Sequence, residues 1–350
     1  MSKKNIIVTG GYGFIGSCLI RELLKDGNLF VCNIDKLTYS SNIESVDSSN
    51  ENYSFVKGDI SDNKLLEKTF LDFQPDIIFN LAAETHVDRS IDNPDSFIKS
   101  NINGTYSLLF EGYKYWKLLS NVKKKNFRFI QISTDEVFGS LDKSENPFDE
   151  NSLYKPNSPY SASKASADHL VRSWNKTYSF PSIITNTSNN YGPWQFPEKL
   201  IPLVITKCLK NKKIPVYGDG SQVRDWIRVE DHVTGLLSIM ESGVVGEKYN
   251  IGANCQLRNI DVVNDICLAM DELSPKNECS FKELINFVSD RPGHDFRYAI
   301  NNNKIKKLGW SPKYSWKIGI FDTVKWYLDN KNFLLSTDKN GYSGERLGKL

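Results

Sequence analysis

Short runs of β-branched and apolar residues alternate with longer stretches of helical periodicity through the first half of the chain. The short runs predict six strands, at Asn5–Thr9, Leu29–Ile34, Tyr53–Lys57, Ile77–Asn80, Phe127–Ser133 and Ser182–Asn186. The longer stretches predict helices at Phe14–Lys25, Asn63–Asp72, Pro94–Leu118 and Pro159–Tyr178. This alternation is typical of βαβ units, so we expect an α/β fold with a doubly wound parallel sheet. Its ligand should bind at the carboxyl ends of the strands.

The pattern changes after Asn189. Loops rich in Pro and Gly separate shorter elements there, at Tyr191–Pro197, Gly218–Ser221 and Arg291–Gly293. The chain of 350 residues also exceeds the roughly 250–300 residues at which a single hydrophobic core stops growing. We therefore expect a first domain over residues 1–188, a smaller C-terminal α/β lobe over residues 189–334 that is interleaved with it, and a polar tail over residues 335–350.

Composition narrows the class of protein. A charged fraction of 25% with 39% hydrophobic residues is typical of a folded globular chain. The 44 basic residues almost balance the 42 acidic ones, so neither nucleic acid nor an acidic membrane surface is expected as a partner. No apolar run approaches the ~18–20 residues that span a bilayer, and glycines interrupt the first apolar run, which excludes a signal peptide. The six cysteines include no C-x-x-C pair, so we expect neither a disulfide framework nor a metal site, and we expect a soluble cytoplasmic enzyme.

Three glycines, Gly10, Gly13 and Gly16, end the first predicted strand and begin the first predicted helix. Three spaced glycines can also be an ordinary strand–helix turn. Here, however, the next strand leads to Asp35, about twenty residues further on, where an acid can bind ribose hydroxyl groups. The glycines allow a pyrophosphate to approach the backbone at the helix N-terminus. The first domain is thus predicted to be a dinucleotide-binding Rossmann domain. Asp35 repels a 2′-phosphate and so favours NAD over NADP, although Lys36 follows it.

Tyr160 and Lys164 stand four residues apart at the start of a predicted helix. The pattern Y-x-x-x-K occurs four times in the chain, so the spacing alone means little. Tyr53 and Lys57 lie in a predicted strand, where four residues span roughly 13 Å. The two other pairs lie among aromatic residues and lysines that are typical of packed or solvated helix faces. Only Tyr160 follows Ser158-Pro159 and precedes small residues that allow a ligand to approach closely.

The proposed chemistry requires this pairing. A free phenol has a pKa near 10, and bringing it to about 7 takes roughly 4 kcal/mol. One ammonium about 4.5 Å away, at an effective dielectric constant near 20, supplies about that much. We therefore expect Lys164, helped by an oxidised nicotinamide, to lower the pKa of Tyr160 and make it a catalytic base.

Two adjacent acids, Asp135 and Glu136, follow Thr134 at the end of the apolar strand Phe127–Ser133. They can be loop acids in a turn, but the end of a strand is where a doubly wound sheet presents catalytic groups. If both face a ligand, mutual repulsion should keep one of them protonated. The sequence then predicts an acid and a base side by side.

These segments resemble the extended short-chain dehydrogenases/reductases, and among them the nucleotide-sugar dehydratases of the dTDP-glucose 4,6-dehydratase family. The match runs from about Asn5 to Tyr327. Its motifs are V-T-G-G-Y-G-F-I-G-S, D-K-L-T-Y, L-A-A-E-T-H-V-D-R-S, S-T-D-E-V-F-G, S-P-Y-S-A-S-K, N-N-Y-G-P, P-E-K-L-I-P, V-R-D-W and D-R-P-G-H-D. The Thr-Asp-Glu motif is the most specific, because related epimerases share the glycines and the Tyr/Lys pair but lack the acids.

The resemblance implies a closed redox cycle on one sugar, with NAD as the cofactor. Tyr160 takes the proton of the glucose C4 hydroxyl while a hydride passes from C4 to NAD⁺, and Thr134 hydrogen-bonds at that hydroxyl. Glu136 then removes the proton at C5, and Asp135 protonates the C6 hydroxyl as it leaves. The hydride returns to C6, which gives a 4-keto-6-deoxy sugar of the kind from which deoxysugars such as rhamnose are made.

The resemblance also implies which residues bind the ligands. It carries cofactor contacts onto Gly10, Gly13, Phe14, Ile15, Gly16, Asp35, Lys36, Leu37, Thr38, Asp59, Ile60, Leu81, Ala82, Ala83, Ser100, Tyr160, Lys164 and Asn190. It carries contacts with the nucleotide sugar onto Thr85, Thr134, Asn189, Lys199, Leu200, Pro215, Val216, Tyr217, Arg224, Asn259, Asp290, Arg291, Pro292, Gly293 and His294. Arg228 departs from the family pattern, which has an aromatic residue or His there. A homodimer is implied as well, with the helices Pro94–Leu118 and Pro159–Tyr178 forming a four-helix bundle.

Alternatives stay open at this point. UDP-glucose 4,6-dehydratases share the acid pair, so the substrate can be dTDP-glucose or UDP-glucose. A UDP-sugar 4-epimerase or a decarboxylating synthase of the same fold is disfavoured by the acid pair. A non-catalytic NAD-binding regulator is disfavoured by Tyr160 and Lys164, since binding alone requires neither.

Overall fold

A parallel sheet of seven strands forms the centre of the molecule. The structure is a computed structural model, and it describes residues 3–275 and 279–336. The strand order is β10-β6-β5-β4-β1-β2-β3, and every neighbouring pair is parallel. The bounds are β1 (Lys4–Thr9), β2 (Leu29–Asp35), β3 (Tyr53–Lys57), β4 (Ile77–Asn80), β5 (Arg128–Thr134), β6 (Ser182–Thr187) and β10 (Lys248–Ile251). The predicted doubly wound α/β fold is confirmed, but the prediction of six strands is wrong, because β10 adds a seventh beside β6.

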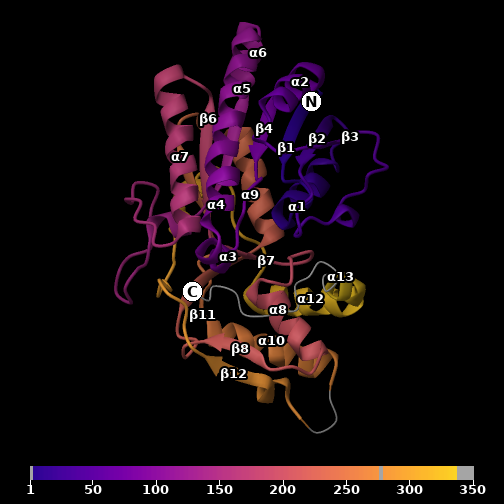
Figure 1. The fold of residues 1–350 in the computed structure, drawn as a ribbon, viewed down its shortest axis with the longest axis vertical. Helices are drawn as coiled ribbons and strands as arrows, with labels where there is room; N and C mark the ends of the chain where they lie inside the picture. Colours follow the sequence, from indigo (N-terminus) through magenta and orange to yellow (C-terminus); the bar gives the residue numbers. More distant parts are fainter. Residues whose placement is uncertain (1–2, 276–278, 337–350) are drawn as a thin grey trace.

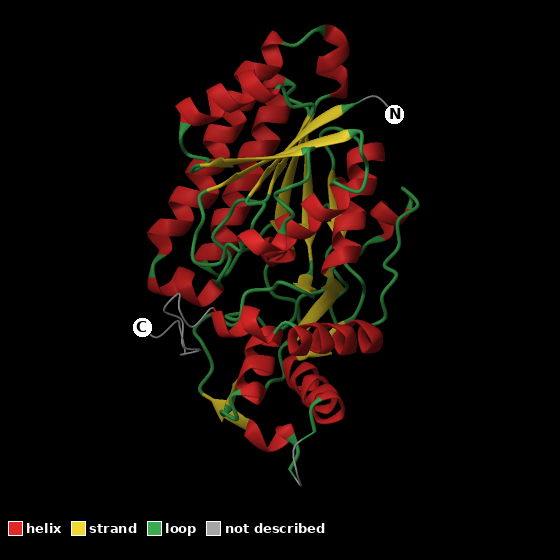
Figure 2. Ribbon diagram, turned by 90° about the vertical axis from the view of Figure 1, so that its right-hand side faces the viewer, coloured by secondary structure: helices red, strands yellow, loops and turns green. Residues whose placement is uncertain are grey.

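Helices cover both faces of this sheet, as Figure 2 shows with the strands in yellow. On one face α1 (Phe14–Leu23) packs beside α9 (Val229–Ser242), and their apolar side chains share a core with Ile6 and Val8 of β1. On the other face α2 (Asn63–Phe73), α5 (Gly104–Leu118) and α7 (Pro159–Tyr178) lie side by side (Figure 1) and share a core with Ile7. The central strands are apolar on both sides because both faces are buried.

The predicted helix Pro94–Leu118 is helical throughout, but it is not a single α-helix. It consists of α4 (Pro94–Phe97), a π-helical turn (Ile98–Asn103) and α5. The π turn buries Asn101, whose amide donates to the Glu84 carbonyl at 3.0 Å and to Ser163 Oγ at 2.8 Å. A local widening of a helix is frequent at functional sites, and this one connects the end of β4 to α7. Two further short helices, α3 (Val87–Asp92) and α6 (Asn121–Asn126), complete this part.

The second core lies below the sheet in Figure 1 and contains α8 (Leu200–Leu209), α10 (Asn259–Leu273) and α12 (Trp316–Asp329). A two-stranded parallel sheet pairs β8 (Ile214–Tyr217) with β12 (Ile285–Val288). A three-stranded sheet, β11 (Gln256–Arg258), β9 (Val223–Arg228) and β7 (Asn189–Tyr191), joins the two cores. The remaining helices are α11 (Asn303–Lys306) and α13 (Lys331–Ser336), together with 3₁₀ turns at Ile43–Ser45, Asp135–Phe138 and Phe281–Leu284.

The chain passes from one core to the other more than once. The apolar side chains of α9 and β10 belong to the first core, as do Ile305 and Trp310. A domain boundary at residue 188 stays a prediction, and most of the predicted polar tail, residues 337–350, lies outside the described residues. Among the described helices, each is too short or too polar to cross a bilayer.

Candidate active site

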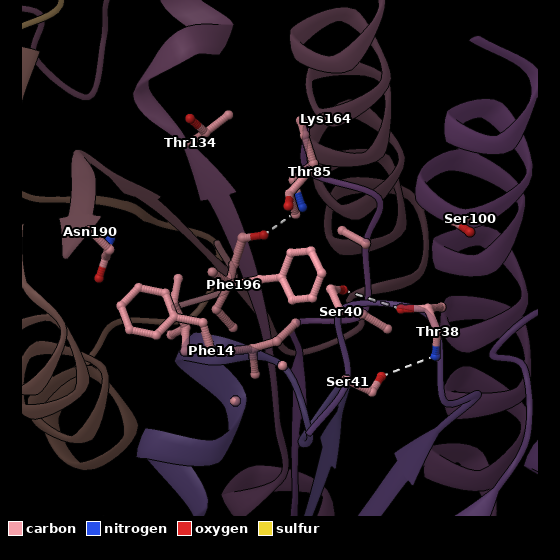
Figure 3. A pocket seen from close by; sticks show the side chains of 18 of the residues that line it. Phe14, Thr38, Ser40, Ser41, Thr85, Ser100, Thr134, Lys164, Asn190 and Phe196 are labelled. Carbon is pink, nitrogen blue, oxygen red and sulfur yellow. Dashed lines mark hydrogen bonds between the residues drawn. The ribbon is translucent and has the colours of Figure 1, made fainter. Parts of the chain in front are cut away.

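A pocket opens at the carboxyl ends of β1, β2, β4, β5 and β6, between the two cores. The glycine turn, the acid pair and the Tyr160–Lys164 pair all line it. Figure 3 shows Phe14 and Phe196 facing this space, with Thr38, Ser40 and Ser41 close together at one side. The site is therefore where the topology of a doubly wound sheet places ligands.

The turn between β1 and α1 requires glycine. Gly10 has φ +69°, and a Cβ there would lie 2.9 Å from the Cα of Ala82. A Cβ on Gly16 would lie 2.3 Å from the Gly10 carbonyl oxygen. Gly13 forms the N-cap of α1 without a side-chain hydrogen bond from the described residues, so the first amide N–H groups are available to an anion. This cradle fits the pyrophosphate of a dinucleotide.

Asp35 ends β2 at the rim of the pocket and is buried. Its Oδ2 accepts from the Tyr12 amide at 3.0 Å, and its Oδ1 accepts from the Leu37 amide at 2.8 Å. The side chain of Lys36 points toward residues beyond the carboxyl ends of β3 and β4. Its Nζ donates to Ser100 Oγ at 2.8 Å and lies 3.7 Å from both an Asp59 and a Glu84 carboxylate oxygen. Two acids already share the charge of Lys36, which agrees with the predicted preference for a ribose without a 2′-phosphate.

The structure brings almost all of the predicted cofactor residues to this pocket. They are Gly10, Gly13, Phe14, Ile15, Gly16, Asp35, Lys36, Thr38, Asp59, Ile60, Leu81, Ala82, Ala83, Ser100, Tyr160, Lys164 and Asn190. Leu37 is the exception. Its φ of +61° turns the side chain away from the pocket, and it packs against the core that contains β1.

Several residues that line the pocket were missed by the sequence analysis: Ser40, Ser41, Gly58, Ser133, Thr187, Ser188, Gln195, Phe196 and Glu198. Gly58 and Thr187 end or follow predicted strands, so the rule that ligands bind at strand ends would have found them. Residues 195–198 come from the loop before α8, where no local signal points to the cofactor.

Glu198 joins the segment that follows β2 to helix α3. Tyr39, after β2, donates its hydroxyl to Glu198 Oε1 at 3.0 Å, and Arg89 Nε of α3 donates to Oε2 at 2.8 Å. The Arg89 guanidinium also lies 4.2 Å from the centre of the Tyr39 ring, whose edge meets Phe196. We call Tyr39, Arg89, Phe196 and Glu198 the clasp.

Tyr160 and Lys164 occupy one face at the start of α7. Ser158 and Ser161 form a reciprocal capping box and Pro159 occupies the first turn, so the helix begins at a fixed point just before Tyr160. Lys164 Nζ donates to the Ile132 carbonyl of β5 at 2.7 Å, and burial lowers its pKa to about 8. The start of α7 is thereby attached to the strand that carries the acid pair.

The lowering of the Tyr160 pKa by Lys164 together with an oxidised nicotinamide stays a prediction. Burial, followed by the charge of Glu136, raises the pKa of the Tyr160 phenol above its ordinary value. The pKa expected from the sequence assumes a phenol in water with one ammonium beside it. In the structure the phenol is buried beside an acid, and the ammonium is directed at a carbonyl.

The acid pair begins a 3₁₀ turn directly after β5. Thr134 Oγ1 accepts from the Glu136 amide at 3.2 Å and donates to Asp135 Oδ1 at 3.3 Å. Burial, and then the charges of Glu136 and Asp225, raise the pKa of Asp135 well above its ordinary value. Burial also raises the pKa of Glu136, but Arg291, Arg224 and Lys199 oppose this shift. The upward shift is therefore opposed more strongly at Glu136 than at Asp135, and the roles of acid and base stay a prediction.

The predicted substrate residues fall into three groups. Thr85, Thr134, Asn189 and Lys199 line the pocket. Lys199 Nζ donates to the Thr85 carbonyl at 2.8 Å, and the buried Oδ1 of Asn189 has no donor among the described residues. An unpartnered oxygen at the wall of a pocket suits a ligand that donates hydrogen bonds.

The second group, Tyr217, Arg224, Asp290, Arg291 and His294, lies outside the lining residues but on the Glu136 side of the site. Arg291 Nη1 donates to Asp88 Oδ1 at 2.7 Å, and Tyr217 donates to Oδ2 of the same acid at 3.0 Å. His294 Nδ1 lies 2.6 Å from Asp290 Oδ1, and Arg224 donates to the Asp295 carbonyl at 3.0 Å. Two arginines beside the pocket suit a diphosphate.

The third group does not reach the pocket: Leu200, Pro215, Val216, Asn259, Pro292 and Gly293. Val216 and Leu200 pack in the second core, Pro215 pairs with β12, and Asn259 begins α10. Arg228 also lies away from the lining. It pairs with Glu230 and Asp322 and stacks 4.2 Å from the Tyr314 ring centre. Across residues 3–275 and 279–336, no group of three or more His, Cys, Asp or Glu side chains is arranged to hold a metal ion.

Comparison with known proteins adds to this geometry. The family model of GDP-mannose 4,6 dehydratase matches residues 7–323. The chain is 51% identical to a dTDP-glucose 4,6-dehydratase of Escherichia coli, covering 98% of this chain and 99% of that protein. It is 50% identical to the dTDP-glucose 4,6-dehydratase of Neisseria gonorrhoeae, covering 94% and 97%.

Solved structures agree with these relatives. The dTDP-glucose 4,6-dehydratase of Bacillus anthracis, in complex with NAD, has a TM-score of 0.84 and 42% identity, covering 95% of this chain and 99% of that one. That of Streptomyces venezuelae, with NAD and TYD bound, has a TM-score of 0.86 and 36% identity over the same shares. A UDP-glucose 4-epimerase of Thermus thermophilus, in complex with NAD, reaches 0.81 at 26% identity, covering 93% and 99%. With its acid pair at the end of β5 and its near full-length match to these dehydratases, the chain belongs to the dTDP-glucose 4,6-dehydratase family.

Proposed function

We propose that this protein converts dTDP-glucose to dTDP-4-keto-6-deoxyglucose and water, with NAD as a cofactor that is restored in each turnover. The observation that carries the proposal is the placement of Thr134, Asp135 and Glu136 on the same pocket as Tyr160 and Lys164. Binding of a dinucleotide alone requires neither the acids nor the phenol. The product has the chemistry of a precursor for deoxysugars such as rhamnose.

The cofactor is held by the chain's own groups. The amides at the start of α1 and the glycine turn bind its pyrophosphate, and Asp35 accepts from a ribose. Lys164 and Tyr160 line the part of the pocket beside the acid pair. A bound NAD⁺ would supply the hydride acceptor for C4 of the sugar and, once reduced, the hydride donor for C6.

Tyr160 accepts the proton of the C4 hydroxyl as that carbon is oxidised, with Thr134 hydrogen-bonded at the same oxygen. The ketone at C4 makes the C5 proton acidic, and Glu136 removes it. Asp135, which burial keeps protonated, gives its proton to the C6 hydroxyl as water leaves. When hydride is added at C6, Glu136 returns a proton to C5. The proton that Tyr160 took from the C4 hydroxyl replaces, through solvent, the one that Asp135 gave to the leaving water, so the net change is the loss of one molecule of water.

We propose dTDP-glucose as the substrate, with UDP-glucose as the second candidate. Lys199, Arg224 and Arg291 supply positive charge beside the pocket for a diphosphate in both cases. The relatives at about half identity, which are named for dTDP-glucose, favour the first. A UDP-sugar 4-epimerase function is disfavoured because that reaction has no use for an acid pair.

The test is an assay of dTDP-glucose and UDP-glucose side by side, without added NAD and in heavy water. We expect product from dTDP-glucose at the higher rate, with deuterium at C5, because Glu136 exchanges its proton with solvent. A 4-epimer formed in place of the keto sugar would contradict the proposal. So would the absence of turnover with either nucleotide sugar.

We further propose a homodimer through α5 and α7. Their outer faces carry an aromatic stripe of exposed or half-exposed residues, namely Tyr106, Phe110, Tyr113, Trp174 and Tyr178. Tyr106 stacks on Phe110 and meets Trp174 edge-on, so the stripe is continuous across both helices. An exposed apolar patch of this kind is typical of an interface, and two copies would give a four-helix bundle.

Light scattering tests this assembly. We expect the wild-type mass to be that of two chains and Phe110→Asp to shift it toward one, while Phe287→Asp, on the exposed face of β12, leaves it unchanged. A monomeric wild type would contradict the proposal. A cytoplasmic location is also proposed, supported by the finding that none of the six cysteines, all within residues 3–275 and 279–336, forms a disulfide bond.

A further inference from the structure

Asp168 is a buried acid behind the catalytic pair. It follows Lys164 by about one turn of α7, and only 1% of its surface is exposed. It does not line the pocket, whereas Lys164 does. Burying a carboxylate costs several kcal/mol unless partners compensate for the lost water, so its position needs a reason.

Three donors converge on one oxygen of this acid. Asp168 Oδ2 accepts from Ser133 Oγ at 2.7 Å, from the Tyr154 hydroxyl at 2.9 Å and from Asn186 Nδ2 at 3.5 Å. Three groups that can donate to one oxygen favour the ionised form of the carboxyl. Its Oδ1 is buried and has no donor among the described residues. Burial raises the pKa of Asp168, and the Lys164 ammonium, about one turn earlier on α7, is the strongest of the influences that oppose this shift.

Lys164 and Asp168 form hydrogen bonds with two consecutive residues of β5, Ile132 and Ser133. Lys164 Nζ donates to the Ile132 carbonyl at 2.7 Å, and Ser133 donates to Asp168. The next residue is Thr134, whose carbonyl accepts from Asn186 Nδ2 at 3.1 Å, and the same amide reaches Asp168. The end of β5 is thus held from one side, immediately before the acid pair.

We propose that Asp168 is a positioning residue, which fixes the end of β5 that carries Thr134, Asp135 and Glu136, and whose negative charge stabilises the Lys164 ammonium. It acts through Ser133 and Lys164 and touches neither substrate nor cofactor. The two roles make separate predictions, because one depends on a hydrogen bond and the other on a charge.

The charge role predicts a change in pH dependence. Burial lowers the pKa of Lys164 to about 8, and Asp168 opposes that shift. Tyr160 lies one turn before Lys164 on α7, Tyr154 contacts Asp168 from the preceding loop, and Lys248 of β10 feels the Asp168 charge. Removing the negative charge by Asp168→Asn makes Lys164 lose its proton about one pH unit lower, or more. The alkaline limb of the kcat profile then moves down by the same amount.

The experiment compares wild type with Asp168→Asn, Asp168→Glu and Tyr154→Phe, all loaded with NAD. Competitive acetylation by acetic anhydride, followed by mass spectrometry, measures the Lys164 pKa without any turnover. We expect a fall in Asp168→Asn only, since Glu keeps the charge and Tyr154→Phe removes one donor but not the acid. Equal Lys164 pKa values in wild type and Asp168→Asn would overturn the charge role.

The kcat profiles rest on the proposed function, whereas the acetylation does not. A wild type without turnover would defeat the proposed function and leave the acetylation result standing on its own. Ser133→Ala tests the hydrogen-bond role, and we expect kcat to fall about tenfold at every pH, with the alkaline limb in place. An unchanged kcat in this variant overturns that role. If Asp168→Asn does not fold, Asp168→Ser removes the same charge and leaves space for water.

Discussion

Asp135 and Glu136 are adjacent in the chain but occupy unequal surroundings. Asp135 lies near two further acids, Glu136 and Asp225, whereas Arg291, Arg224 and Lys199 act on Glu136. The proposed roles require such a difference, since one carboxyl must keep its proton at a pH at which its neighbour is ionised. The pair can therefore give and take a proton in one elimination.

Glu136→Gln should separate the two halves of the reaction. We expect dehydration to fall by about 10²-fold or more, because no base removes the C5 proton. Oxidation at C4 does not need Glu136, so the absorbance of the reduced cofactor should appear after substrate is added. Glu145→Gln, an exposed acid in the following loop, is the control and should keep the wild-type rate. Wild-type dehydration by Glu136→Gln would show that another group is the base.

We expect His232 to make the free energy of unfolding depend on pH. It is fully buried in α9, its Nδ1 lies 2.9 Å from Asn190 Oδ1, and burial lowers its pKa to about 3. A histidine with a lower pKa in the folded than in the unfolded chain favours folding above its unfolded pKa of about 6.5. That stability is lost as the pH falls below this value.

We expect the wild type to lose about 2 kcal/mol more unfolding free energy between pH 7 and pH 5 than His232→Gln, which has no proton to gain. Urea titrations at the two pH values measure the difference. Gln can keep the contact with Asn190, so the comparison isolates the titration. Equal losses in the two proteins would mean that His232 is not held neutral.

For single residues, the sequence predicted which side chains lie at the pocket better than it predicted their pKa values. Asp135, Glu136 and Lys164 were found because strand ends and helical spacing are local features. The upward shift of the Tyr160 pKa was not foreseen, because it comes from burial and from an acid on another element. The role of Asp168 was also out of reach, since its partners come from β5, β6 and a loop.

At the scale of the element, the turn between β1 and α1 depends on a backbone that only glycine tolerates. We expect Gly10→Ala to lower the unfolding free energy by at least about 1 kcal/mol, because Gly10 has positive φ and its new Cβ would meet the Ala82 backbone. Binding of NAD should weaken in parallel, as measured by equilibrium dialysis. Gly27→Ala is the matched control, since no described atom lies within 4 Å of its added Cβ. A destabilised Gly27→Ala would show that loss of glycine alone explains the effect.

Elements with long apolar runs were predicted within a residue or two. β10 was missed because its four residues, Lys248–Ile251, include a lysine and an asparagine and carry little strand signal. Its place in the sheet comes from the edge of β6, which supplies the hydrogen bonds. The π turn at Ile98–Asn103 was also unforeseen, since an α-helix and a π turn share nearly the same apolar pattern.

At the scale of the whole molecule, the clasp joins three segments that are far apart in sequence, and Phe196 and Glu198 of the clasp line the pocket. Because one molecule of NAD must survive both halves of the reaction, we expect the clasp to slow its release. Tyr39→Phe removes the donor to Glu198 but keeps the ring against Phe196 and Arg89. Hydrogen bonds to a charged group contribute about 1.5–3 kcal/mol, so NAD should dissociate about tenfold faster or more.

Release of NAD is measured by rapid gel filtration of the loaded protein, without substrate. Tyr314→Phe is the matched control, because Tyr314 also lies 4.2 Å from an arginine, Arg228, but outside the pocket. If NAD dissociated from Tyr39→Phe at the wild-type rate, the hydrogen bond between Tyr39 and Glu198 would have no role in retaining the cofactor.

The position of β10 has a consequence for synthesis of the chain on the ribosome. β6 emerges with one side paired to β5 and the other side bare, and it remains so until residues 248–251 have been made. A bare strand is a template for pairing with another nascent chain. The first 188 residues produced alone would keep that edge permanently, and we expect them to aggregate where the complete chain folds. The last strand of the cofactor-binding sheet is encoded after the first segments of the second core. The cofactor-binding part of the chain therefore cannot be separated from the rest without leaving the edge of β6 unpaired.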